Sequence, residues 1–252
     1  MSATIQTARQ TARPARAVAG QTAIGLSLAA ALVAGWFCAH VYGVFLHGWT
    51  PFGFAIAPLL ILVQCWLNVG LFIVAHDCMH GSLAPGRPRL NRAVGRIVLA
   101  LYAGFSFDRL IDKHHAHHRH SGTADDPDFH ADGPRAFWPW YVTFFRRYFG
   151  LREFLVLAAL LATYLFVFRV DPANALVFWG VPAILSSVQL FYYGTYLPHR
   201  HEADTFSDAH NARSLELGPF ASLVTCFHFG GYHHEHHEQP WMPWWRLPSA
   251  RP

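Results

Sequence analysis

Three short clusters of histidines are the residues whose types and spacing indicate chemistry in this sequence. They are His76-Asp77-Cys78-Met79-His80, His114-His115-Ala116-His117-His118 and His233-His234-Glu235-His236-His237. Within each cluster, histidines recur three or four residues apart, which brings imidazoles onto one face of a helix. Converging imidazole nitrogens are ligands for transition metals. A lone histidine is usually a satisfied polar residue, but three such clusters together predict a metal site.

The number of histidines indicates more than one metal ion. Structural zinc is usually held by four ligands, and catalytic zinc by about three protein ligands plus water. Eight or more histidines overfill such a site, so the sequence predicts two metal ions. Imidazole binds iron, zinc, copper and nickel, and ligand type alone does not choose among these metals.

The elements that must position these clusters are apolar. Of the 252 residues, 53% are hydrophobic and only 13% are charged, which is about half the charged fraction of an ordinary soluble domain. Four apolar runs, near 22–46, 53–75, 153–168 and 175–197, predict four transmembrane helices. A fifth run at 93–107, which Arg96 and Gly104 interrupt, predicts an interfacial helix.

The charged residues predict the orientation of these spans. Every Lys and Arg except Arg169 falls on the side that holds the N-terminus, the segment 76–152 and the residues after 198. The positive-inside rule makes that side cytoplasmic, and all histidines except His40 and His47 share it. No run of basic residues interleaved with aromatics occurs, so nucleic-acid binding is not expected.

Polar residues along the second span point toward the predicted site. Gln64, Asn68, Phe72, His76 and His80 follow one another at steps of four, which places them in one stripe along a helix. Polar groups within a span are costly unless they face the bundle interior or a functional cavity. The stripe is therefore expected to face inward, either toward the site or, for Gln64 and Asn68, toward neighbouring helices.

The cluster spacing HxxxH, HxxHH, HxxHH resembles the membrane fatty-acid desaturase and hydroxylase superfamily, whose members activate dioxygen at a histidine-ligated di-iron centre. The amino-acid sequence around and beyond the clusters resembles that of the bacterial β-carotene ketolases. The segments are GLFIVAHDCMHGS (70–82), HHAHHRHSGTADDPDF (114–129), GTYLPHR (194–200), HNARS (210–214), CFHFGGYHHEHH (226–237) and PWWRLP (243–248). The resemblance begins near residue 60. It implies an all-α integral membrane protein, with a mobile arm over 1–20 and one membrane-embedded oxygenase domain over 21–252, capped by a cytoplasmic histidine-rich region.

The resemblance also implies a reaction. The C4 methylene of a β-ionone ring would be oxidised to a ketone by two hydroxylations and loss of water, converting β-carotene to echinenone and canthaxanthin, or zeaxanthin to astaxanthin. Dioxygen is the co-substrate. The sequence has no GxGxxG dinucleotide fingerprint and no iron–sulfur cysteine set, so the electrons are expected from a separate ferredoxin or reductase.

Two enzyme classes with the same metal site stay open as alternatives. A carotenoid ring hydroxylase would stop at an alcohol, and a fatty-acyl desaturase or hydroxylase would take a flexible chain. A metal transporter is disfavoured, because its ligands would lie near mid-membrane, whereas these histidines gather beyond the ends of the predicted spans.

Carried over position by position, the resemblance assigns nine ligands to two Fe²⁺ ions: His76, His80, His114, His117, His118, His199, His233, His236 and His237. His199 is favoured as the ninth ligand because it ends a polar stripe of the last span. His228 is the rival ninth ligand and is otherwise a supporting residue. Acids beside the clusters are expected to orient the ligands through their second ring nitrogen: Asp77, Asp125, Asp126, Asp128 and Glu235.

Overall fold

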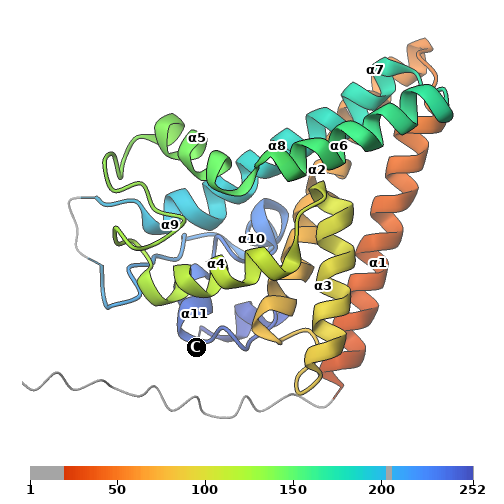
Figure 1. Ribbon diagram of the computed structural model, residues 1–252. Helices are drawn as coiled ribbons and strands as arrows, with labels where there is room; N and C mark the ends of the chain where they lie inside the picture. The colour runs from red at the N-terminus through yellow and green to blue at the C-terminus, as the bar shows by residue number, and fades with distance from the viewer. Residues whose placement is uncertain (1–19, 203–205, 252) are drawn as a thin grey trace, which may run out of the picture.

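The computed structural model describes residues 20–202 and 206–251, and its regular structure over these residues is helical, without a β-strand. Two long helices form one side of the molecule (Figure 1). Helix α1 (Gln21–Val41) continues through the π-helical turn η1 (Tyr42–Leu46), and α2 (Pro51–His80) returns beside it. The largest buried apolar cluster includes much of the second half of α2, so this helix is central to the fold.

Polar contacts join α1 and the segment around α2. The Trp36 indole donates to the Asn68 carboxamide oxygen at 2.7 Å, and the Gln21 amide donates to the Ser82 carbonyl oxygen at 2.7 Å. Gln64 is also buried, and neither of its amide atoms has a hydrogen-bond partner among the residues described. The polar stripe of α2 therefore faces inward, as its spacing predicts, and Asn68 serves a contact between helices.

Two shorter helices lead from α2 into the histidine-rich half of the molecule. Helix α3 (Pro88–Ala103) runs back alongside α2 (Figure 1), and Gly104 ends it in the left-handed conformation, with φ at 67°. Helix α4 (Phe107–His120) then turns away and carries the second histidine cluster. The predicted helix over 93–107 is wrong in its bounds, because a left-handed residue at 104 closes α3.

The next two helices meet at a sharp bend. Helix α5 (Phe137–Tyr148) is followed by α6 (Leu151–Ala162), which continues as the π-helical turn η2 (Thr163–Val167). The bend between them is 79°. Gly150 N donates to the Glu153 carboxylate at 3.1 Å, and this contact caps the new helix at its first turn. We call the bend the α5–α6 elbow.

A single helical run leads back toward the histidines. Its parts are α7 (Pro172–Ala175), η3 (Leu176–Gly180), α8 (Val181–Phe191), η4 (Tyr192–Tyr196) and α9 (Leu197–His199). Two of these parts, η3 and η4, are π-helical turns, which are rare and often occur at functional sites. The run ends at His199, one of the predicted ligands.

The last segments form a cap over the end of α2. They are α10 (Pro219–Cys226), α11 (His233–Glu238) and the 3-10 helix η5 (Trp244–Ser249). Between α10 and α11, Phe227 and His228 both adopt positive φ, at 46° and 72°. Such angles are uncommon for residues other than glycine. They produce the tight turn that delivers the third histidine cluster to the cap.

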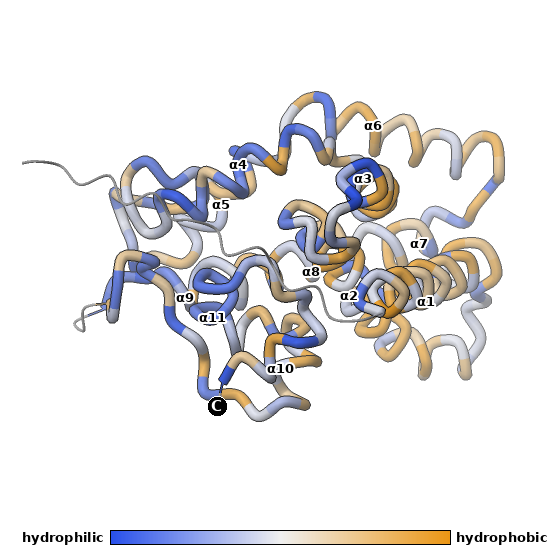
Figure 2. The backbone as a smooth tube through the Cα atoms, turned by 90° about the horizontal axis from the view of Figure 1, so that it is seen from below, coloured by the Kyte–Doolittle hydropathy of each residue, from blue (hydrophilic) through white to orange (hydrophobic). Residues whose placement is uncertain are grey.

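Within the described residues, three helices are long and apolar enough to cross a bilayer: Gln21–Leu46, Pro51–His80 and Pro172–His199. The predicted span over 153–168 lies in Leu151–Val167, which passes the same test only together with α5 across the elbow. Figure 2 shows hydrophobic residues concentrated along α1, α6 and α7, and hydrophilic residues along α4, α9 and α11. The predicted arm over 1–20 lies outside the described residues except for Gly20.

Candidate metal centre

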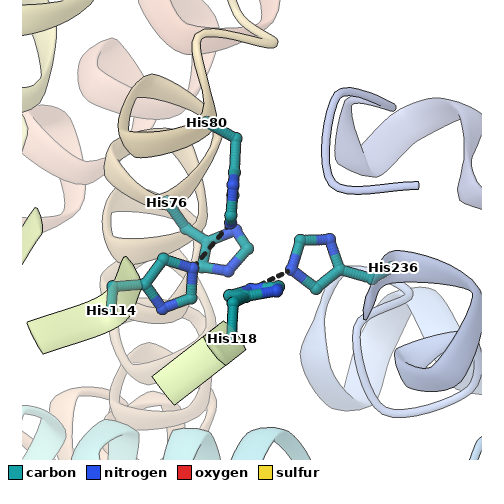
Figure 3. A group of neighbouring side chains, drawn as sticks. All are labelled: His76, His80, His114, His118 and His236. Carbon is teal, nitrogen blue, oxygen red and sulfur yellow. Dashed lines mark hydrogen bonds between the residues drawn. The ribbon is translucent and has the colours of Figure 1, made fainter. Parts of the chain in front are cut away.

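Five histidines from three helices form the first group, shown in Figure 3. They come from the end of α2, from α4 and from α11: His76, His80, His114, His118 and His236. One ligand nitrogen of each lies within 4.8 Å of those of the others. The closest pairs are His80 Nε2 and His114 Nε2 at 2.6 Å, and His118 Nε2 and His236 Nε2 at 3.1 Å. This is the five-histidine group.

Four further histidines form a second group beside the first. They come from α4, α9 and α11, and all are buried: His117, His199, His233 and His237. His233 Nε2 lies 2.8 Å from His199 Nε2 and 3.1 Å from His237 Nε2. The His237 ring stacks on His118 of the five-histidine group, with 4.2 Å between ring centroids. The structure thus brings all nine predicted ligands together in two adjacent groups.

The second and third clusters are each divided between the two groups. On α4, His114 and His118 lie four residues apart and join the five-histidine group, whereas His117 joins the four-histidine group. On α11, the pair four residues apart, His233 and His237, joins the four-histidine group, and the remaining ligand joins the other. Positions four apart share a helix face, so an HxxHH sequence on one helix reaches two neighbouring sites.

Hydrogen bonds at the other ring nitrogen test whether these groups fit a cation. His199 Nδ1 donates to the Asn211 carbonyl oxygen at 2.8 Å, and His233 Nδ1 donates to the Phe229 carbonyl oxygen at 3.2 Å. A carbonyl only accepts, so Nδ1 carries the proton and Nε2 of the neutral ring carries a lone pair. Two such lone pairs face each other 2.8 Å apart. That arrangement repels unless a cation lies between the nitrogens, so the donor set fits a metal ion.

Burial keeps most of these rings neutral. Burial first, and then the charge of neighbouring histidines, holds the pKa well below its ordinary value for His114, His118, His233, His236 and His237. Neutral imidazole is the form that binds a metal. These five rings are therefore held in the form that binds a metal.

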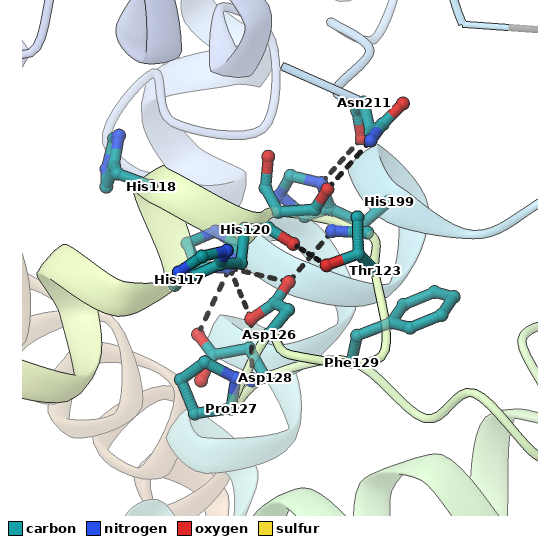
Figure 4. Close-up of polar contacts among 12 residues, drawn as sticks. His117, His118, His120, Thr123, Asp126, Pro127, Asp128, Phe129, His199 and Asn211 are labelled. Carbon is teal, nitrogen blue, oxygen red and sulfur yellow. Dashed lines mark hydrogen bonds and ion pairs between the residues drawn. The ribbon is translucent and has the colours of Figure 1, made fainter. Parts of the chain in front are cut away.

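His117 has a different environment because two carboxylates face it (Figure 4). Its Nδ1 lies 3.0 Å from both carboxylate oxygens of Asp126 and 3.8 Å from Asp128 Oδ2. Burial lowers the pKa of His117, but the charges of Asp126 and Asp128 outweigh burial and raise it. Gly122 N holds Asp126 with a 2.9 Å hydrogen bond, and the Tyr148 hydroxyl donates to Asp128. These carboxylates orient the ring at Nδ1 and leave Nε2 toward its group.

Two other acids that the sequence predicts as supporting residues have different partners. Asp77 accepts a hydrogen bond from Trp244 N, with both carboxylate oxygens at 3.3 Å. Glu235 accepts from the Ser214 hydroxyl and from the Arg251 guanidinium. The Asp77 contact ties the cap to α2, and the Glu235 contact with Arg251 ties the C-terminal segment to the cap. They support the third cluster through the backbone rather than through a ligand ring.

The remaining histidines near the clusters lie outside the two groups. His228 stacks on Trp244 at 6.3 Å between centroids, and His115 Nε2 lies 3.1 Å from the Met79 carbonyl oxygen. His234 faces away toward Asp208, at 2.8 Å. The Asp125 side chain is exposed and makes no contact with either group in the part of the chain that the structure describes.

An aromatic cavity opens onto both histidine groups. Histidines from each group form one wall, and the walls away from them include Phe72, Tyr102, Phe105, Phe144, Phe145, Phe149 and Phe229. These residues come from α2, from the end of α3, from the elbow and from the turn before α11. An apolar ring of flat shape fits between such aromatic walls. The cavity is therefore suited to an apolar molecule held beside the two histidine groups.

Two carbonyl groups that orient ligands were not found from the sequence. Asn211 and Phe229 accept from His199 and His233 through their backbone oxygens. The HNARS segment, which contains Asn211, resembles the family sequence but has no histidines at the spacing of metal ligands. Its Asn211 has φ at 45°, a conformation that asparagine tolerates better than most residues, and that preference is the only local signal.

The comparisons with known proteins agree with this geometry. The family model described as fatty acid desaturase matches residues 49–155 and 148–252. A β-carotene ketolase from Paracoccus sp. (strain PC1) is 50% identical over 237 residues, which cover 92% of this chain and 94% of that protein. The chain belongs to the β-carotene ketolases of the fatty acid desaturase family.

Other carotenoid ketolases are also similar to this chain in sequence. The β-carotene ketolase of Paracoccus sp. (strain N81106 / MBIC 01143) is 52% identical over 231 residues, covering 91% of this chain and 93% of that protein. The zeaxanthin 4-ketolase of Chlamydomonas reinhardtii is 35% identical over 250 residues, covering 95% of this chain and 55% of that protein. The fatty acid desaturase family is a family of di-iron oxygenases, and the two adjacent histidine groups suit such a centre.

Proposed function

We propose that this chain is a carotenoid 4-ketolase, an oxidoreductase that converts the C4 methylene of a β-ionone ring to a ketone. β-Carotene would yield echinenone and then canthaxanthin, and zeaxanthin would yield astaxanthin. One observation carries the proposal: a cavity with aromatic walls opens directly onto both histidine groups. The relatives named as β-carotene ketolases and as a zeaxanthin 4-ketolase support the choice of carotenoid over fatty acid.

The nine clustered histidines would hold two Fe²⁺ ions, five of them at one ion and four at the other. When bound, iron would supply activation of dioxygen, so that one oxygen atom enters the C4–H bond and the other leaves as water. Two such hydroxylations at C4 followed by loss of water give the ketone. The protein's own residues would bind the ring between aromatic walls and hold His117, His199 and His233 at Nδ1.

The electrons are proposed to come from a separate ferredoxin or reductase. Each hydroxylation consumes O₂, two electrons and two protons, and releases one water. The four cysteines are free and scattered, and three of them are buried, so they do not form an iron–sulfur cluster of the chain's own. A protein donor that docks at the histidine-rich cap is consistent with this arrangement.

The proposed setting is the cytoplasmic membrane. The domain over 21–252 would span it four times, with the elbow helices as the bent fourth span and with α3 at the interface. The active site and both termini would face the cytoplasm. The concentration of basic residues and of hydrophilic segments on the cap side supports this orientation.

Pigment analysis tests the function. Cells that accumulate β-carotene and express this chain are expected to form echinenone and canthaxanthin, read by chromatography and absorption spectra. Purified iron-loaded protein with NADPH alone is expected to leave β-carotene unchanged until an electron carrier and its reductase are added. The matched control is the His114→Ala, His233→Ala double variant, which removes one ligand from each group and is expected to form no ketone.

Other products would assign the chain elsewhere. Hydroxylated rings without ketones would indicate a carotenoid ring hydroxylase. Altered membrane fatty acids with unchanged β-carotene would indicate a fatty-acyl desaturase or hydroxylase. Turnover with NADPH and no partner protein would refute the need for an external donor.

A further inference from the structure

The Thr195 hydroxyl lies in the wall of the aromatic cavity without a hydrogen-bond partner. The residue is buried, with 7% of its surface exposed, and it lines the cavity beside the histidine groups. Over residues 20–202 and 206–251, no atom of the protein accepts from or donates to this hydroxyl. An occupant of the cavity that supplies a partner to this hydroxyl gains a hydrogen bond.

Three other threonines in the helices behave differently. Thr143, Thr163 and Thr225 each donate to the carbonyl oxygen four residues earlier, at 2.9, 2.9 and 2.8 Å. This is the usual habit of threonine within a helix. Thr195 lies in the π-helical turn η4 and makes no such bond. Its hydroxyl therefore stays available to a molecule in the cavity.

Thr195 lies near the end of the cavity that the histidine groups form. It precedes His199 of the four-histidine group by four residues, so both side chains lie on one face of the helical run. Gly194 also lines the cavity, and a Cβ atom built there would meet no other atom within 4 Å. Space for a substrate ring thus exists directly beside the Thr195 hydroxyl.

The neighbouring cavity hydroxyls are already engaged. The Tyr148 hydroxyl donates to Asp128, and the Ser187 hydroxyl bonds to the Ile184 carbonyl oxygen and to Tyr141 at 3.0 and 2.6 Å. The Tyr102 hydroxyl, also in the cavity wall, has the Ser186 side chain as its partner. An oxygen atom introduced on a ring in this cavity therefore finds the Thr195 hydroxyl as a free partner.

We propose that Thr195 is a specificity-determining residue that retains the C4 alcohol formed by the first oxidation until the second oxidation has occurred. This inference rests on the proposed ketolase function. The unreacted ring has no polar atom at C4 and gains nothing from the hydroxyl. The alcohol forms a hydrogen bond with it, and the product is consequently a ketone rather than a released alcohol.

The product ratio tests the proposal in β-carotene-accumulating cells. Thr195→Val keeps the shape but removes the hydroxyl, and it is expected to raise the ratio of 4-hydroxy to 4-keto carotenoids about fivefold, the effect of one hydrogen bond on a binding ratio. Thr195→Ser is expected to restore the original ratio. Thr163→Val is the matched control, since it removes a hydroxyl from another π-helical turn far from the cavity. Thr195→Ala repeats the measurement if the valine variant does not accumulate.

A binding measurement separates retention from a general loss of structure. In iron-loaded protein kept in detergent without O₂ or an electron donor, Thr195→Val is expected to raise the Kd for 4-hydroxy-β-carotene about fivefold and to leave the Kd for β-carotene unchanged. An unchanged product ratio in a wild-type-like ketone producer would overturn the proposal. So would slower use of zeaxanthin with an unchanged ratio from β-carotene, because the hydroxyl would then serve the C3 oxygen. Wild-type protein that makes neither alcohol nor ketone would instead refute the ketolase function itself.

Discussion

Three of the four rings in the four-histidine group, those of His117, His199 and His233, are held at Nδ1 by a carboxylate or a carbonyl oxygen. His199 shows what this means for iron. Its Nδ1 donates to the Asn211 carbonyl oxygen, while its Nε2 lies 2.8 Å from that of His233. We predict that His199→Ala lowers iron from about two per chain toward one. We also expect ketone yield to fall by more than the roughly 10–100-fold that loss of an outer-shell partner typically costs. Metal analysis of purified protein and pigment chromatography give the two readouts.

His228→Ala is the matched control for that prediction. His228 is about as buried as the ligands, but its ring stacks on Trp244 and joins neither group. The control is expected to retain iron and to lose only packing. If His228→Ala loses iron while His199→Ala keeps it, the ninth ligand is His228.

At the scale of single residues, the sequence was sufficient to identify the nine histidines that converge and insufficient for the contacts that hold them. Histidines three and four apart predict convergence because helix geometry fixes their directions. The division of His117 and His118 between two groups depends on how α4 lies against α11, which no local spacing encodes. The Asn211 carbonyl is also invisible in the sequence, because every residue type has a carbonyl oxygen.

Among the elements, the junction between α3 and the elbow rests on one glycine. Gly104 has φ at 67°, and a Cβ atom there would lie 2.7 Å from Val156 Cγ1 of α6. The Gly104 carbonyl oxygen also accepts from Arg152 at 2.9 Å. We predict that Gly104→Ala destabilises the protein by about 1–2 kcal/mol for the left-handed backbone and by about 1–3 kcal/mol more for overpacking. The measurement is the midpoint of thermal unfolding in detergent.

Gly86→Ala separates these two contributions. Gly86 has φ at 73°, but a Cβ atom there would meet no other atom within 4 Å. Gly86→Ala is expected to lower the midpoint of thermal unfolding less than Gly104→Ala does. Equal shifts would mean that the contact with α6 contributes nothing to stability.

Apolar runs predicted the long helices well because a span must satisfy its own backbone in lipid. The observed helix ends differ from the predicted ones where a capping residue determines the end: Gly104 at the end of α3 and Thr50 at the start of α2. The elbow was not predicted. A glycine between two apolar segments, such as Gly150, is equally compatible with a bent span and with a loop between separate helices. Packing of α5 aromatics on Phe191 of α8 sets that bend, and such contacts are not local in sequence.

For the whole molecule, the connections far from the cap lie together. The Asn174 amide of α7 donates to the His47 carbonyl oxygen, in the connection between η1 and α2, at 3.0 Å. Figure 1 shows α7 at the end of the long helices opposite the C-terminus. We predict that alkaline phosphatase fused after Asp171 is active in a bacterial host, whereas a fluorescent protein fused after Pro252 fluoresces in the cytoplasm. Phosphatase activity from a fusion at the C-terminus would reverse the orientation.

The sharing of histidine clusters also has a consequence for biosynthesis. Residues 233–237 supply ligands to both groups, and they are made after every other ligand. A nascent chain that has already inserted its helices therefore holds neither group complete. Both groups therefore lack some of their histidines until residues 233–237 have been made. A ribosome that stalls before residue 233 leaves a product without a finished oxygen-activating centre in the membrane.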